Sequence, residues 1–240
     1  MTAPNVSNPT RSAATANQVR LPRTAALGPG RGEQPRLLID APAGAAEIYL
    51  HGATVTSWVP RGGAEVIFTS RQAVFDGATA VRGGIPLCLP EFGAGINGDA
   101  VPKHGWARIA PWRLRTVTST DDGGVRALLS VSRDHLTALC EIQIGETLRL
   151  GLSLRNDGTE PRTVEAAAHT YLSVHDVTAS LVSGLAGASY SDNLARSPQE
   201  LRQVQDGDVR ITGPVDRIYD SAEPVTVTDP GHRRAIHIDK

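Results

Sequence analysis

Apolar and polar residues alternate along several short stretches of the chain. Between residues 147 and 156, Leu148, Leu150, Leu152 and Leu154 occupy one set of alternate positions, whereas the other set begins with Arg149. Successive side chains of a β-strand point to opposite faces of its sheet. The pattern therefore predicts a strand with one buried and one solvent-exposed face.

Further stretches show the same alternation, separated by Gly, Pro or Asp. We expect strands at residues 46–52, 54–60, 65–70, 112–120, 125–132, 163–174, 224–229 and 234–239. No stretch has a convincing amphipathic helical period. Many short strands without intervening helices favour antiparallel sheets packed face to face over a parallel α/β sheet. The sequence therefore predicts an all-β sandwich.

The first 34 residues have a different composition from the rest. They are rich in Ala, Pro, Thr, Asn and Gly and lack apolar periodicity, which predicts a disordered tail over 1–34 and a β-sandwich domain over 35–240. Pro4, Pro9 and Pro22 obstruct the amphipathic helix of a transit peptide, and there is no apolar core of a secretory signal. We expect a cytoplasmic protein.

Charge and cysteine content restrict the class of ligand. Lys and Arg total 24 against 25 Asp and Glu, so there is no basic field for nucleic acid. No apolar run approaches the ~18 residues of a membrane span. The only two cysteines, Cys88 and Cys140, lie in apolar segments without metal-binding spacing, which favours buried thiols. We expect a monomer that binds a small molecule, with no nucleic-acid or membrane partner and no metal.

The first candidate for chemistry is the segment "VRGGIPLCLPEFGAG", residues 81–95. Gly83–Gly84 allow a sharp turn or a close approach of the backbone to a ligand, and Pro86 stiffens the residues after it. The segment therefore resembles a rigid platform for Arg82. The alternative is a β-bulge in which Arg82 forms an ion pair with Glu91.

The second candidate is "PKHGWAR", residues 102–108. In an extended segment, His104 and Arg108 would point the same way about 13 Å apart, at about 3.3 Å per residue, and would bracket a small anion. Arginine suits phosphate oxygens and a tryptophan face suits a sugar ring, so Lys103 and Trp106 are added as possible cleft residues. The alternative is a hairpin tip with solvated charges.

The third candidate is "AAAHTYLSVHD", residues 166–176. His169 follows three alanines, which leave space around a partly buried ring, and Tyr171 lies on the same face. Imidazole often serves as a general acid or base at neutral pH; the alternative is a hydrogen-bonded core histidine. A metal shared with His175 is disfavoured, because six strand residues span about 20 Å.

Five motifs occur in a fixed order: "VRGGIPLCLPEFG", "PKHGWARIAPW", "AAHTYLSVHDV", "GLAGASYSDNL" and "VDRIY". From about residue 36 to its end, the chain resembles the aldose 1-epimerase superfamily, in particular its hexose-6-phosphate mutarotase branch. The resemblance implies a galactose-mutarotase-like β-supersandwich of antiparallel sheets with a sugar cleft on its concave face. It also implies interconversion of the α and β anomers of glucose 6-phosphate or a close relative.

The resemblance also implies roles for individual residues. The hemiacetal is opened by proton transfer and closes on its other face, which requires no cofactor. The implied roles are phosphate binding by Arg82 and Arg108, binding beside the sugar ring by His104, protonation of the ring oxygen by His169, and binding of sugar hydroxyls by Asp216.

The chain departs from the family pattern at one point. The family's general base is a glutamate on a strand well after a segment such as "HRRAIHIDK", but the chain stops at Lys240 and no glutamate has a matching context. We therefore expect the last strands and the base to be missing. Two alternatives to an epimerase stay open: a sugar-phosphate-binding module without catalysis, and a β-sandwich interaction domain with structural arginines.

Overall fold

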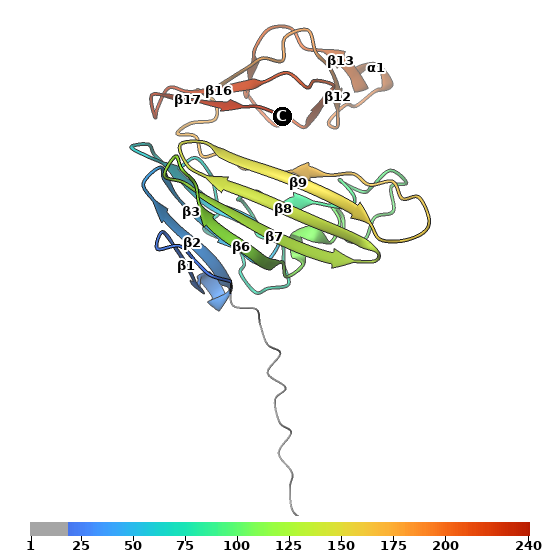
Figure 1. The fold of residues 1–240 in the computed structure, drawn as a ribbon. Helices are drawn as coiled ribbons and strands as arrows, with labels where there is room; N and C mark the ends of the chain where they lie inside the picture. Colours follow the sequence, from blue (N-terminus) through green and yellow to red (C-terminus); the bar gives the residue numbers. More distant parts are fainter. Residues whose placement is uncertain (1–18) are drawn as a thin grey trace, which may run out of the picture.

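The fold is built on two four-stranded antiparallel sheets (Figure 1). The computed structural model describes residues 19–240. The first sheet contains, in spatial order, β1 (Ala25–Pro29), β2 (Pro35–Ala41), β3 (Gly44–Tyr49) and β4 (Thr54–Pro60). The second contains β6 (Arg113–Ser119), β7 (Val125–Arg133), β8 (Leu136–Ile144) and β9 (Leu148–Asn156). The all-β prediction is confirmed.

One hydrophobic core is shared by these two sheets. Leu37 and Ile48 from the first sheet and Leu129 and Ile142 from the second are fully buried in the same cluster. Burying such a side chain stabilises the fold by about 1.5–3 kcal/mol. The two sheets therefore form the sandwich that the alternating pattern predicts.

Strand β8 was not predicted, although its pattern is clear. Leu136, Ala138, Cys140 and Ile142 occupy alternate positions and are buried, and the strand pairs with β7 and β9 along its whole length. Cys140 is a free thiol, as is the buried Cys88. Burial raises the pKa of Cys140 to about 12, so this thiol is a core side chain and not a reactive one.

The predicted tail over 1–34 is wrong for its second part. Ala25–Pro29 form β1, which pairs with β2 from Ala25 opposite Ile39 to Pro29 opposite Pro35, and a 3-10 turn, η1 (Arg31–Glu33), comes next. Backbone hydrogen bonds hold β1 in the sheet, and they do not depend on an apolar side-chain pattern. Residues 1–18 of the predicted tail lie outside the described residues.

Two predicted strands, 65–70 and 163–174, are replaced by irregular extended chain. Only β5 (Leu87–Cys88) and β10 (Ala167–Ala168) form a regular pair here, beside isolated bridges such as Ile67 to Leu172. Prolines lack a backbone donor and break the ladder. The carbonyl of Pro86 nevertheless accepts a hydrogen bond from the N–H of His169, at 3.0 Å, which places the two motif segments side by side.

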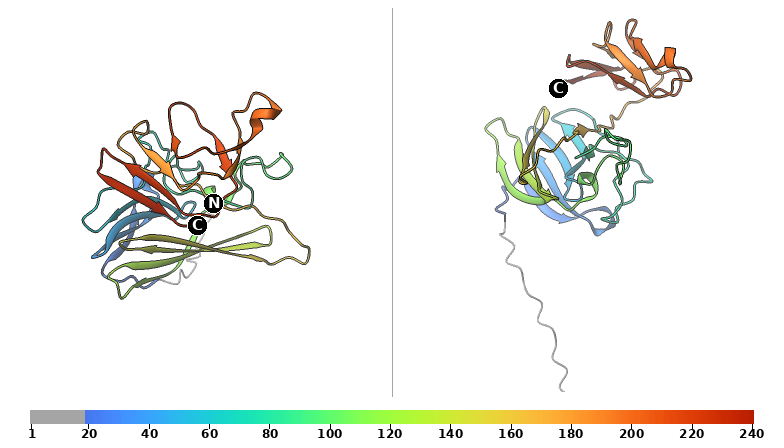
Figure 2. Two further views of the ribbon diagram at one scale, coloured as in Figure 1. Left: turned by 90° about the horizontal axis from the view of Figure 1, so that it is seen from above. Right: turned by 90° about the vertical axis from the view of Figure 1, so that its right-hand side faces the viewer.

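The C-terminal residues form a further layer of short hairpins beside the sandwich (Figure 2). Its elements are β11 (Leu181–Ser183), β12 (Ser189–Asp192), α1 (Pro198–Leu201), β13 (Arg202–Val204), β14 (Val209–Arg210), β15 (Arg217–Tyr219), β16 (Val225–Asp229) and β17 (Arg234–Ile238). Leu185, Val209 and Val225 form a small core of their own. In residues 19–240, no helix has the length and apolar character needed to cross a membrane.

A buried aspartate ties this layer to the sandwich. Asp229 is completely buried and accepts hydrogen bonds from the ring Nδ1–H of His232 and the Nε–H of Arg234. Arg234 also donates to the carbonyls of Glu65 (2.9 Å) and Ser173 (2.5 Å). Burial raises the pKa of Asp229, but hydrogen bonds from His232 and from the backbone N–H of His175 outweigh burial and lower it overall.

We expect Asp229→Ala to lower the free energy of unfolding by about 1–3 kcal/mol, because the donors that Asp229 accepts from, His232, Arg234 and the N–H of His175, lose their acceptor. Chemical denaturation of this variant and of wild type measures the change. The control is Asp239→Ala, a substitution at an exposed position, whose stability should stay within about 0.5 kcal/mol of wild type. Equal stabilities for the two variants would contradict the structural role of Asp229.

Candidate functional site

A hollow of about 190 Å³ brings together residues that are far apart in the sequence. The side chains of Arg82, His104, Arg108 and His169 all contribute to it, so the three predicted motifs meet in one place. The complete lining consists of Ala80, Val81, Arg82, Pro86, His104, Arg108, His169 and Tyr171.

Arg82 projects from a platform that the diglycine makes possible. Gly83 and Gly84 both have positive φ, 122° and 74°. A Cβ on Gly83 would lie 2.5 Å from the Cα of Thr69, and a Cβ on Gly84 would lie 2.5 Å from the carbonyl oxygen of Val55. Only glycine fits such close approaches of the backbone. The diglycine is therefore packed tightly against the backbone of Thr69 and Val55, whereas the side chain of Arg82 is exposed.

The two arginines of the hollow carry charges that no carboxylate of residues 19–240 neutralises. In the described part of the chain, neither Arg82 nor Arg108 belongs to a salt bridge. The alternative in which Arg82 pairs with Glu91 is therefore wrong. Two unpaired guanidinium groups beside one hollow favour an anionic ligand, because a planar fork of N–H donors matches phosphate or carboxylate oxygens.

The segment that carries His104 and Arg108 is folded back and not extended. His104 and Gly105 have positive φ, 65° and 68°, and a 3-10 turn, η2 (Ala107–Ile109), comes next. The predicted extended spacing of about 13 Å therefore does not apply. An Nη2–H of Arg108 donates to the carbonyl of Lys103 at 2.7 Å, while its buried Nε has no hydrogen-bond partner within residues 19–240.

The two histidines of the hollow are neighbours in space. Their ring centroids are 6.1 Å apart and the rings meet edge to face. Burial lowers the pKa of His104, and the positive charges of Arg108, His169 and Lys103 lower it further. At neutral pH the ring of His104 is therefore uncharged and available for hydrogen bonding.

His169 is exposed to solvent at the hollow, and not partly buried as predicted. Its backbone is fixed by the hydrogen bond to Pro86, and its ring packs on Tyr171 with centroids 4.9 Å apart. Tyr171 lies on the same face as predicted and also lines the hollow. An accessible imidazole on a fixed backbone can transfer a proton to or from a bound ligand.

Three other candidate residues lie outside the lining. Trp106 is only 5% exposed and belongs to the main core, so its prediction as a cleft residue is wrong. Lys103 is exposed and contributes its carbonyl to Arg108. Asp216 accepts a hydrogen bond from the side chain of Asn193 in the C-terminal layer, and its sugar-binding role stays a prediction.

Sequence reasoning missed Ala80 and Val81 of the lining and the turn that precedes them. The carboxylate of Asp76 accepts hydrogen bonds from the N–H groups of Thr79 and Ala78, which lower the pKa of Asp76 to about 2. This turn leads directly into Ala80 and Val81 of the lining. The Asp-Gly pair at 76–77 is the turn signal that identifies it.

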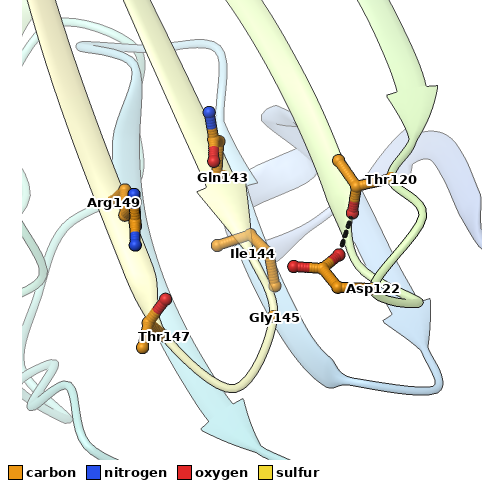
Figure 3. A pocket seen from close by; sticks show the side chains of 7 residues that line it. All are labelled: Thr120, Asp122, Gln143, Ile144, Gly145, Thr147 and Arg149. Carbon is orange, nitrogen blue, oxygen red and sulfur yellow. Dashed lines mark hydrogen bonds between the residues drawn. The ribbon is translucent and has the colours of Figure 1, made fainter.

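A second hollow of about 190 Å³ lies between the β6–β7 and β8–β9 turns (Figure 3). The carboxylate of Asp122 accepts hydrogen bonds from the hydroxyl of Thr120 and the N–H of Gly124, which lower its pKa. This carboxylate is occupied by its own turn, and no histidine lines the hollow. The first hollow is therefore the better candidate for chemistry.

Residues 35–240 match the family model described as aldose 1-epimerase, and the chain belongs to this family. A protein of Cenchrus ciliaris named "putative glucose-6-phosphate 1-epimerase" is 31% identical over 214 residues, which cover 81% of this chain and 63% of that relative. A protein of Escherichia coli with the same name is 30% identical over 192 residues, which cover 76% of this chain and 62% of that relative. The chain thus spans less than two thirds of the length of these relatives.

Solved structures confirm the predicted fold. The crystal structure of a "putative mutarotase" from Salmonella typhimurium superposes with a TM-score of 0.80 at 27% identity, covering 91% of this chain and 74% of that one. A galactose mutarotase-like protein of Clostridium acetobutylicum gives a TM-score of 0.61 at 12% identity over 87% of this chain and 78% of that one. The fold is therefore a galactose-mutarotase-like β-supersandwich, and the predicted family resemblance is confirmed.

Proposed function

We propose that the hollow lined by Arg82, His104, Arg108 and His169 binds a hexose 6-phosphate and interconverts its α and β anomers. The observation that carries this proposal is the juxtaposition of two histidines and two arginines around one hollow, the arginines having no carboxylate partner among the described residues. The names of the curated relatives support glucose 6-phosphate as the first substrate to test.

The arginines act on the part of the substrate that does not react. Arg82 and Arg108 hold the phosphate, and the binding energy released there orients the sugar ring against the histidines. Arg108 is already anchored through the carbonyl of Lys103, so little freedom of this side chain is lost on binding.

His169 acts on the ring oxygen. As a general acid it donates a proton to this oxygen while a base removes the proton from the anomeric hydroxyl; the C1–O5 bond breaks and the open aldehyde forms. Rotation about the C1–C2 bond and closure on the other face give the second anomer. General acid catalysis of this kind contributes about 10²–10⁴-fold to a rate.

A second candidate function is binding without turnover. It is favoured by the composition of the lining, which includes no Asp or Glu in the part of the chain that the structure describes. In this case the arginines and His104 retain the sugar phosphate, and ring opening proceeds at the rate in buffer.

Two measurements separate these functions. The optical rotation of freshly dissolved α-glucose 6-phosphate follows anomer exchange, and calorimetric titration with the same sugar phosphate follows binding. An epimerase accelerates the change in rotation over buffer, whereas a binding module releases heat without acceleration. If the protein neither releases heat on titration nor accelerates the change in rotation, both functions are excluded.

A further inference from the structure

The loop 91–104 is closed at its base by the imidazole of His104. The N–H of Gly93 donates to Nδ1 of His104 at 3.1 Å, and the N–H of His104 donates to the carbonyl of Gly93 at 2.7 Å. A backbone N–H can only donate, so Nδ1 is an acceptor and carries no proton. The proton of the neutral ring is therefore on Nε2.

The surroundings of the ring keep this state in place. Phe92 meets the ring edge to face, with centroids 5.2 Å apart. The positive charges of Arg108, His169 and Lys103 disfavour a second proton on the ring. Within residues 19–240, Nε2 has no hydrogen-bond partner, and His104 lines the hollow. The ring thus has one free N–H, and because His104 lines the hollow we expect this group to be within reach of an acceptor atom there.

Glu165 attaches the base of this loop to the segment that carries His169. Its Oε2 accepts a hydrogen bond from the N–H of Phe92 at 3.2 Å, and its own N–H donates to the carbonyl of Pro90 at 2.8 Å. Pro90 and Phe92, which make these contacts, lie just before Gly93 in the chain. Glu165 lies four residues before His169, so the segment that carries His169 also contacts the base of the loop that carries His104.

We propose that Glu165 is a positioning residue which, through Phe92 and Gly93, holds His104 as a neutral Nε2–H donor toward a sugar oxygen. The inference rests on the proposed function of the hollow for the identity of the acceptor. An uncharged donor binds oxygen without placing a further cation beside Arg108 and Lys103. The two histidines then have separate roles, His104 as hydrogen-bond donor and His169 as proton carrier.

Nitrogen-15 NMR of the histidine rings, without any sugar present, tests the proposal. The wild-type chain should show His104 with an unprotonated Nδ1 and a protonated Nε2 at neutral pH. Glu165→Gln retains an acceptor oxygen for Phe92 and should keep this tautomer, whereas Glu165→Ala should give a mixture of tautomers. Glu160→Ala, at an exposed position of the same segment, should leave the spectrum unchanged.

The same variants are then titrated with glucose 6-phosphate. Loss of one oriented hydrogen bond should weaken binding by about 3- to 10-fold in Glu165→Ala and leave Glu160→Ala unchanged. A wild-type His104 with its proton on Nδ1 would overturn the proposal even if no variant folds. Because the tautomer is observed without sugar, failure of the proposed function and failure of this inference give different results.

Discussion

Replacing His169 by glutamine is expected to reduce the acceleration of anomer exchange by about 10²–10⁴-fold. Glutamine has polar atoms for hydrogen bonding but cannot transfer a proton at neutral pH. Binding of glucose 6-phosphate should change little, because the phosphate is held by the arginines. The rate is measured by optical rotation of α-glucose 6-phosphate, and the affinity by calorimetry.

The control for this substitution is His135→Gln, at an exposed position in the turn between β7 and β8. It should leave both rate and affinity at the wild-type values. A full rate in His169→Gln would assign proton transfer to another group. A loss of binding equal to the loss of rate would make His169 a binding residue only.

Removing the guanidinium groups is expected to have the second large effect. Hydrogen bonds to charged groups contribute about 1.5–3 kcal/mol each, so Arg82→Ala and Arg108→Ala should each weaken glucose 6-phosphate binding by roughly 10- to 100-fold. Arg108→Lys retains the charge but loses the planar fork, and should give an intermediate affinity. Calorimetric titration measures all three variants.

The matched control is Arg113→Ala, which removes an exposed arginine from β6 and should leave the affinity unchanged. A further comparison uses glucose, which lacks the phosphate: its affinity should be the same in wild type and in the arginine variants. If glucose and glucose 6-phosphate lose affinity equally, the arginines do not recognise the phosphate.

The sequence predicted strands well where one face of the strand is buried. In β7 the alternating buried positions Val125, Ala127 and Leu129 follow the sequence pattern. The composition of the first 34 residues led to a wrong prediction of disorder at β1. Ala25–Pro29 joins the sheet through its backbone, while most of its side chains stay exposed. The segments 65–70 and 163–174 carry strand-like sequences, but Gly83–Gly84 and Pro86 opposite them interrupt regular pairing.

For the site, the sequence motifs identified the residues that lie around one hollow, but the number of residues between them did not predict their arrangement in space. Arg82, His104, Arg108 and His169 share one hollow, which no count of residues between them reveals. The distance expected between His104 and Arg108 assumed extended chain, and the positive φ of His104 changes the direction of the segment. Trp106 offered a plausible sugar-binding face, yet only the packing of η2 decides that it is buried.

The most direct test of the sugar-phosphate site is exchange NMR of the two anomeric protons of glucose 6-phosphate with the wild-type chain. We expect line broadening and magnetisation transfer between the α and β signals faster than in buffer, with both effects weaker for glucose, which lacks the phosphate. Broadening alone would assign the hollow to binding without turnover. Sharp lines and buffer-rate exchange for both sugars would contradict the proposed site.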